Sequence, residues 1–248
     1  MSKKYLVASG CSWTDADFTS DHHPEMICDW PKWPEILASK LDMKVINVGR
    51  CGSGNEGIYS RALDTIASLP PEEIGLVVIA WSQSQRRDFE FELMYNHKDT
   101  TKRWTNERVD SKGDLYYYVR RSLRYMYSLQ QVCESLNIPY KQFQMIPLFT
   151  AYIHHARNFN INFDNTTSMF RKKLPDKFDA IGYMMESPYW DLIDEDNFIG
   201  WPLIDEGNGF NFEDAFIQRR LGLIVSEEDV HPNKYGHRLL AETVYEYL

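Results

Sequence analysis

Short apolar runs and longer stretches with an apolar residue at every third or fourth position follow one another along the chain. The short runs predict strands around Val7, over Lys44–Val48, over Ile74–Trp81 and over Tyr140–Leu148. Ile74–Trp81 is almost continuously apolar, as expected of a parallel strand covered on both faces. This pattern makes Ile74–Trp81 the predicted centre of the sheet.

The intervening stretches have the spacing of amphipathic helices. The first begins near Pro31 and Pro34, which are tolerated at a helix start, and the second begins near Asn55 as a possible cap. A long helix is predicted over Leu115–Leu136, and a last one begins near Asn233. Strands that alternate with helices predict an α/β fold with a doubly wound sheet.

Two ranges, about 86–114 and 151–225, lack a clear period. We expect them to be irregular insertions over the carboxyl edge of the sheet, where α/β folds bind ligands. No linker rich in Pro, Gly or Ser divides the 248 residues, so one domain over residues 1–248 is predicted.

Composition excludes several classes of protein. The net charge of −9 disfavours nucleic acid as a partner. No apolar run reaches the roughly 18 to 20 residues of a membrane span, and the apolar run at the start is too short for a signal peptide, so a cytoplasmic protein is expected. The four cysteines lack CxxC spacing and are predicted to be free thiols: Cys11, Cys28, Cys51 and Cys133.

Ser12 lies in a glycine-containing turn directly after the first strand, where an α/β fold exposes a nucleophile. A turn-forming serine is the structural alternative. At the other end of the chain, Glu228 and Asp229 precede His231, which Pro232 holds before the last helix. A serine nucleophile needs such an imidazole as base and a carboxylate to orient it. These residues therefore predict a Ser-His-acid arrangement.

A glycine-rich loop, residues 47–55, follows the second strand. Acyl transfer requires hydrogen-bond donors aimed at the developing oxyanion, and the backbone N–H of Gly52 is the predicted donor. A phosphate-binding loop is the alternative, but the spacing is neither GxGxxG nor that of a P-loop.

These motifs, in this order, resemble blocks I, II and V of the SGNH (GDSL-type) hydrolases. The resemblance implies a flavodoxin-like three-layer α/β/α sandwich, in which Ser12 is the nucleophile, His231 the base, and the N–H groups of Ser12 and Gly52 bind the oxyanion. Residues 30–34 (WPKWP), residues 198–202 (FIGWP) and the final block also resemble SGNH-like proteins of tailed bacteriophages, for which the host cytoplasm or the virion is the expected location.

The chain departs from the family in two places. The third block, GxND, is replaced after Trp81 by Ser-Gln-Ser-Gln, so that Ser84 stands at the Asn position and Gln83 is a neighbouring amide donor. The family's acid usually stands three residues before the histidine, which is Glu228 here, whereas Asp229 stands two before it. Asp229 is ranked first and Glu228 second.

Other polar and aromatic clusters fit metal or ligand sites less well. His22-His23 and His154-His155 are adjacent pairs without metal-ligand spacing, so no metal site is predicted. The Tyr and Arg residues of 116–124 read as one helix with a core face and a solvated face. Tryptophans in the insertions can stack on sugar rings or pack in the interior: Trp104, Trp190 and Trp201.

The sequence therefore predicts a serine esterase that hydrolyses a carboxylic ester, with a small-molecule or glycan ester as substrate and an O-acetyl group on a carbohydrate as one form of it. This reaction needs no cofactor. The alternative is a binding or virion-associated protein that keeps the fold with little or no catalysis, motivated by the missing Asn. The sequence leaves the oligomeric state open.

Overall fold

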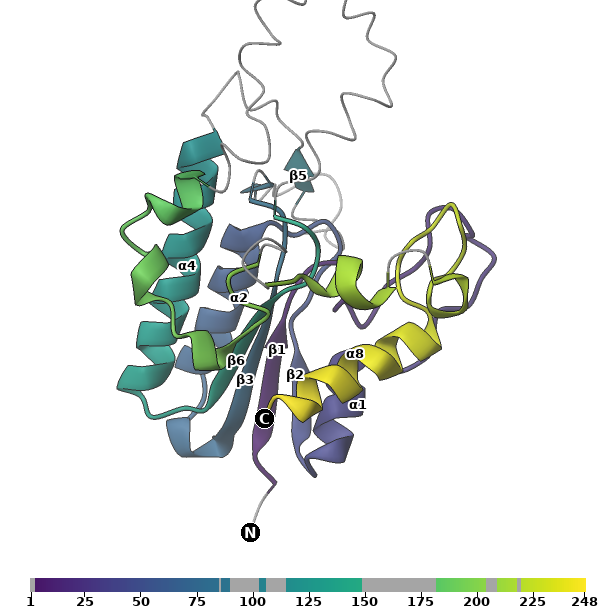
Figure 1. Cartoon of the computed structure of the whole chain (residues 1–248). Coiled ribbons are helices and arrows are strands. Elements are labelled where there is room, and N and C mark those ends of the chain that lie inside the picture. Colours follow the sequence, from purple (N-terminus) through teal and green to yellow (C-terminus); the bar gives the residue numbers. More distant parts are fainter. Residues whose placement is uncertain are drawn as a thin grey trace, which may run out of the picture.

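The computed structural model describes residues 3–84, 86–89, 103–105, 115–148, 182–203, 209–217 and 220–248 (Figure 1). Within these residues, five parallel strands form one sheet in the order β2-β1-β3-β6-β7. This is the flavodoxin-like order. The strands are β1 (Tyr5–Ser9), β2 (Lys44–Asn47), β3 (Ile74–Trp81), β6 (Tyr140–Gln144) and β7 (Phe198–Ile199).

Helices cover both faces of this sheet and complete the predicted three-layer α/β/α sandwich. In Figure 1, α2 and α4 lie on one side of the sheet and α1 and α8 on the other. The long helices are α1 (Trp33–Lys40), α2 (Asn55–Ala67), α4 (Leu115–Ser135) and α8 (Lys234–Glu246). The short ones are η1 (Pro71–Glu73), η2 (Trp190–Leu192), η3 (Glu195–Asn197), the π-helical η5 (Glu213–Ile217) and η6 (Leu221–Leu223).

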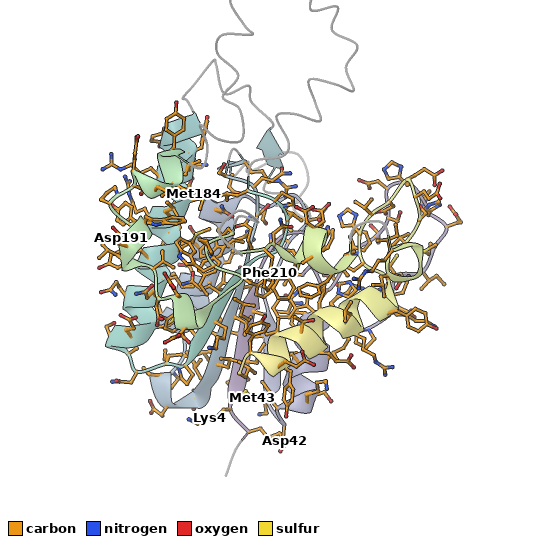
Figure 2. All side chains as sticks on the ribbon, in the orientation of Figure 1. Lys4, Asp42, Met43, Met184, Asp191 and Phe210 are labelled. Carbon is orange, nitrogen blue, oxygen red and sulfur yellow. The ribbon has the colours of Figure 1, made fainter. Side chains whose placement is uncertain are left out.

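Each face of the sheet has its own core. Alternate residues of β3 point to opposite faces, so Val77 packs with the α2 and α4 side and Val78 with the α1 and α8 side. Met184 belongs to the first core and Phe210 packs against the second (Figure 2). All residues of β3 except Gly75 are buried, which confirms the expectation for a central strand with both faces covered.

The boundaries of two predicted elements differ for identifiable reasons. Strand β6 ends at Gln144 rather than Leu148, because the Gln144 side chain donates to the carbonyl of Ile146 (2.7 Å) and Pro147 has no N–H for a ladder. Gly54, not Asn55, is the N-cap of α2. Asn55 instead accepts from Ser82 N–H (2.7 Å), so its side chain joins α2 to the end of β3.

Parts of both predicted insertions form strands. Within 86–114, β4 (Arg87–Phe89) and β5 (Arg103–Thr105) pair antiparallel. Within 151–225, Phe198 and Ile199 form β7, which is the edge strand of the main sheet, so this part of the range is not an insertion over the sheet. Two residues are too short a run to show a period in the sequence, although both side chains are buried.

All four cysteines are free thiols, as predicted. No helix within the described ranges combines the length and the apolar character that crossing a bilayer requires.

Candidate active site

Ser12 stands in a tight turn at the carboxyl end of β1. The N–H groups of Thr14 (2.8 Å) and Asp15 (3.2 Å) both donate to the carbonyl of Cys11, which closes one helical turn. A Cβ atom at Gly10 would lie 2.1 Å from Thr14 Oγ1, so only glycine allows the chain to turn here. The turn holds Ser12 with only 8% of its surface exposed.

His231 and Asp229 reach Ser12 from the opposite end of the chain. The distance from Ser12 Oγ to His231 Nε2 is 2.8 Å, and His231 Nδ1 lies 2.5 Å from Asp229 Oδ1. Since an ionised carboxylate only accepts hydrogen bonds, Nδ1 carries the proton and Nε2 is free to accept one from Ser12. The three side chains therefore form one continuous hydrogen-bonded relay.

A loop between η6 and α8 places His231 and Asp229. Val225 N–H donates to the carbonyl of His231 (2.9 Å), and Ile224 and Pro232 form a β-bridge. Asn233 caps α8, because its Oδ1 accepts from the N–H groups of the first helical turn. This confirms the predicted helix start and fixes the backbone on the far side of His231.

Asp229, rather than Glu228, is the carboxylate that contacts His231. Burial raises the pKa of Asp229, but hydrogen bonds from His231 and Ser20 outweigh it and hold the pKa well below its ordinary value. Ser20 Oγ donates to the second carboxylate oxygen of Asp229 at 2.5 Å. Glu228 is exposed, accepts from Ser226 Oγ (3.3 Å) and lies 3.8 Å from His23, so it faces away from the relay.

Two residues of this site carry no signal in the sequence. Ser20 lies in the loop between β1 and α1, which has no hydrophobic period, and Phe18 in the same loop places its ring 4.5 Å from the imidazole of His231. Only the fold brings this loop against residues 226–231, more than 200 positions later.

The loop that follows β2 brings Gly52 to the same edge of the sheet. Gly52 has a φ of 74°, which glycine adopts without strain. Arg50 N–H donates to the carbonyl of Gly10 (3.1 Å) and Cys51 N–H to Asp15 (2.7 Å), so the loop is tied to the turn of Ser12. Among the described residues, the N–H groups of Ser12 and Gly52 have no acceptor, which leaves both available to a ligand.

Asn47, the first residue of the glycine-rich motif, ties the same two loops. Its amide donates to the carbonyl of Thr14 (2.7 Å) and to Glu35 (2.9 Å), and its Oδ1 accepts from Gly49 N–H (3.0 Å). The motif therefore has a structural function besides the one proposed for Gly52.

The two candidates for the missing Asn differ. Ser84 is fully buried and its hydroxyl donates to the carbonyl of Leu148 (3.1 Å), so its proton is engaged in joining two loops. Gln83 is partly exposed, and its Oε1 accepts from Arg86 Nε (3.2 Å), which directs an amide oxygen toward Arg86. The two side chains thus differ in chemistry, since an amide carries both donor and acceptor atoms and the single hydroxyl proton of Ser84 is directed at Leu148.

The remaining clusters are structural where they are described. Trp190 and Trp201 have ring centroids 4.6 Å apart and pack against the core, which is the packing alternative rather than a sugar platform. His23 Nε2 lies 2.7 Å from Ser226 Oγ. No three His, Cys, Asp or Glu side chains of the described ranges are grouped as metal ligands, and His154 and His155 lie outside these ranges.

No family model and no curated protein matches the chain. Solved structures that it resembles include the psychrotrophic esterase EstA from Pseudoalteromonas sp. (13% identity, 99% of this chain and 96% of that chain, TM-score 0.48). A second is a member of the lipolytic protein G-D-S-L family from Veillonella parvula (12% identity, 98% of this chain and 97% of that chain, TM-score 0.43). A third is a carbohydrate acetylesterase family member from Sinorhizobium meliloti (14% identity, 99% of this chain and 99% of that chain, TM-score 0.41).

At 12–14% identity, the activity and the site residues of these three proteins are not transferred to this chain.

Proposed function

We propose that this chain is a serine esterase of the SGNH (GDSL) type, which hydrolyses a carboxylic ester. The observation that carries the proposal is the relay from Ser12 Oγ through His231 to Asp229, with links of 2.8 Å and 2.5 Å. A structural serine needs no imidazole, and a surface histidine needs no buried carboxylate. Their combination at the carboxyl edge of a parallel sheet favours nucleophilic catalysis.

The proposed reaction has two halves. Ser12 Oγ attacks the ester carbonyl carbon while His231 Nε2 takes the hydroxyl proton, and the carbonyl oxygen becomes an oxyanion. When the tetrahedral intermediate collapses, the C–O bond to the alcohol breaks and His231 returns the proton to that oxygen. Water then attacks the acyl-Ser12 ester, again with His231 as base, which releases the acid and restores Ser12.

Asp229 keeps His231 in the tautomer that accepts a proton at Nε2 and stabilises the imidazolium that forms. The oxyanion is held by the N–H groups of Ser12 and Gly52, both of which lack an acceptor within the described residues. Gln83 or Ser84 supplies the third donor in this proposal, and the Ser84 hydroxyl would have to leave the Leu148 carbonyl to do so. No step requires a metal or a cofactor.

A narrower hypothesis concerns the substrate. An O-acetyl ester of a carbohydrate fits the reaction, and one similar structure is named a carbohydrate acetylesterase. The packed pair Trp190 and Trp201 gives this hypothesis no support. Comparison of acetylated xylan with p-nitrophenyl esters of two- to eight-carbon acids tests it, since a glycan acetylesterase prefers the acetyl group and releases acetate from the polymer.

The first experiment combines turnover with covalent labelling. Purified protein is expected to hydrolyse p-nitrophenyl acetate and to be labelled by a fluorophosphonate at Ser12, identified by mass spectrometry of the peptide, because only an activated serine reacts readily. Ser84 is the internal control and should remain unlabelled. Absence of both turnover and Ser12 labelling in the folded protein would favour the binding protein over the esterase.

Ser20 gives a second prediction, because it donates to Asp229 at 2.5 Å. Ser20→Ala is expected to lower kcat/KM roughly tenfold, the effect of losing about 1.4 kcal/mol from a hydrogen bond to a charged group. Ser20→Thr keeps the hydroxyl and should retain most of the activity. Steady-state kinetics on the ester decide, and equal activity of Ser20→Ala and wild type would contradict the prediction.

A further inference from the structure

The segment directly after β3 reaches across to the loop of Gly52. Arg86 Nη1 donates to the carbonyl of Ser53 (3.2 Å), and Arg86 Nε donates to Gln83 Oε1 (3.2 Å). One guanidinium therefore joins the loop that stands where the GxND block is expected to the loop that carries Gly52. The planar guanidinium suits this, because its donors point in fixed and different directions.

Other contacts hold Arg86 itself in place. Its backbone carbonyl accepts from Arg121 Nη2 of α4 (2.8 Å), and the same nitrogen donates to the carbonyl of Ser84 (3.3 Å). A Cβ atom at Gly54 would lie 2.8 Å from Arg86 Cβ, so the two segments of the backbone pass each other at a distance that only glycine permits. Arg86 is thus fixed at both its backbone and its side chain.

The loop of Gly52 is held at further points. Asp88 accepts from the N–H groups of Gly54 (2.8 Å) and Gly57 (2.7 Å) at the start of α2, where a carboxylate is favourable. Arg61 donates to the carbonyl of Val48 (2.8 Å) and to Ser53 Oγ (2.6 Å). With Cys51 N–H on Asp15, the residues on both sides of Gly52 are anchored, whereas the N–H of Gly52 is not.

We propose that Arg86 is a positioning residue that keeps the Gly52 N–H aimed at the oxyanion. In this chain it provides the mechanical link between the end of β3 and the site, at the point where the sequence lacks the Asn of the third block. This inference rests on the proposed esterase function. Burial lowers the pKa of the Arg86 guanidinium, although the charges of nearby Cys11, Cys51, Asp88 and Glu213 oppose this shift.

The test compares Arg86→Lys and Arg86→Met with Arg124→Met, a control on the exposed side of α4. Since Arg86 acts on the oxyanion donor and not on substrate binding, both Arg86 variants should lower kcat about 10- to 100-fold with KM within about twofold. The affinity for a boronic acid that forms a tetrahedral adduct at Ser12 should fall by a similar factor. Guanidinium ion added to Arg86→Ala should restore part of kcat, which a general loss of stability would not allow.

Hydrogen exchange gives a readout that does not depend on activity. In Arg86→Met, amides of residues 48–57 are expected to exchange at least about tenfold faster, while those of β1 and β3 are unchanged, because only the loop loses an anchor. If the wild type lacks esterase activity, the proposed function fails, and faster exchange still supports the anchor. Unchanged exchange over 48–57, or a lower kcat without a matching loss of boronic acid affinity, would overturn the proposal.

Discussion

Ser12→Ala is expected to lower kcat for ester hydrolysis by about 10⁴- to 10⁶-fold, the range typical of removing the nucleophile from a serine relay. In the proposed mechanism Ser12 Oγ forms the acyl bond, and His231 Nε2, which lies 2.8 Å away, takes the hydroxyl proton in the first step. His231→Ala should therefore cost a similar factor, measured as p-nitrophenolate release by titrated enzyme whose fold is verified by circular dichroism.

The losses in kcat caused by Ser12→Ala and His231→Ala should not be additive. If Ser12 and His231 act as one unit, as proposed, the double variant is expected to be no slower than either single one. Multiplying losses would mean that the two residues contribute independently, which contradicts the relay.

A matched pair of variants tests the carboxylate. Asp229→Asn is expected to lower kcat about 10³- to 10⁴-fold, because the amide no longer holds the proton on His231 Nδ1. Glu228→Gln should stay within about twofold of wild type, since Glu228 is exposed and contacts Ser226 rather than His231. The reverse order of the two effects would show that the static contact at 2.5 Å is not the one that catalysis uses.

The members of the relay could be predicted from the sequence because several motifs agree, although the signal of each one alone is weak. Ser12 follows an apolar strand and a glycine, and His231 stands between a carboxylate and a Pro-Asn helix start. The parallel sheet brings these residues together, because the carboxyl ends of its strands and the loop before α8 meet at one edge. The choice between Asp229 and Glu228 needed the structure, since a side chain's direction in a loop has no sequence period.

Other parts of the site and fold could not be predicted, because they depend on contacts between distant segments. Ser20 is one of many serines in polar loops until Asp229 is placed beside it. Arg86 stands at the start of the range 86–114, which is predicted only as an irregular insertion, yet its guanidinium donates to the carbonyl of Ser53. Strand β7 has two residues, and its pairing with β6 is set by tertiary contacts rather than by its own propensity.

The pH dependence of stability is expected to combine the opposing effects of two ionisable groups, the buried His237 and the partly buried Glu213. His237 Nδ1 accepts from Trp33 N–H (3.3 Å), and burial, together with the charges of Lys32 and His231, lowers the pKa of His237 from 6.5 to about 3. The unfolded chain therefore binds a proton near pH 6.5 that the folded chain refuses. On this account, His237 makes the free energy of unfolding fall as pH drops below about 6.5.

Glu213 has the opposite effect. Burial and the neighbouring Asp214 raise the pKa of Glu213 from 4.5 to about 7, although Arg86 lowers it. Between these two values the folded chain binds a proton that the unfolded chain has released, so Glu213 makes the free energy of unfolding rise as pH drops from about 7 to 4.5.

Each group changes the free energy of unfolding by at most roughly 1.4 kcal/mol per pH unit. The two opposite changes therefore largely cancel between about pH 4.5 and 6.5 in the wild type. His237→Asn keeps an acceptor for Trp33 N–H and removes the effect of His237 on the pH dependence. The free energy of unfolding of this variant should rise by about 2–3 kcal/mol when the pH is lowered from 6.5 to 4.5, whereas that of Glu213→Gln should fall by about as much.

Urea unfolding followed by tryptophan fluorescence at pH 4.5, 5.5 and 6.5 and constant ionic strength measures both variants. Asp229 does not interfere, because its pKa is lowered from 3.8 and its contribution is lost only at more acidic pH. We expect the free energy of unfolding to change with pH in opposite directions in the two variants and to be nearly independent of pH in the wild type. Parallel profiles in all three proteins would mean that His237 and Glu213 titrate alike in the folded and unfolded chains, so that burial of these two groups does not govern the stability of the fold near neutral pH.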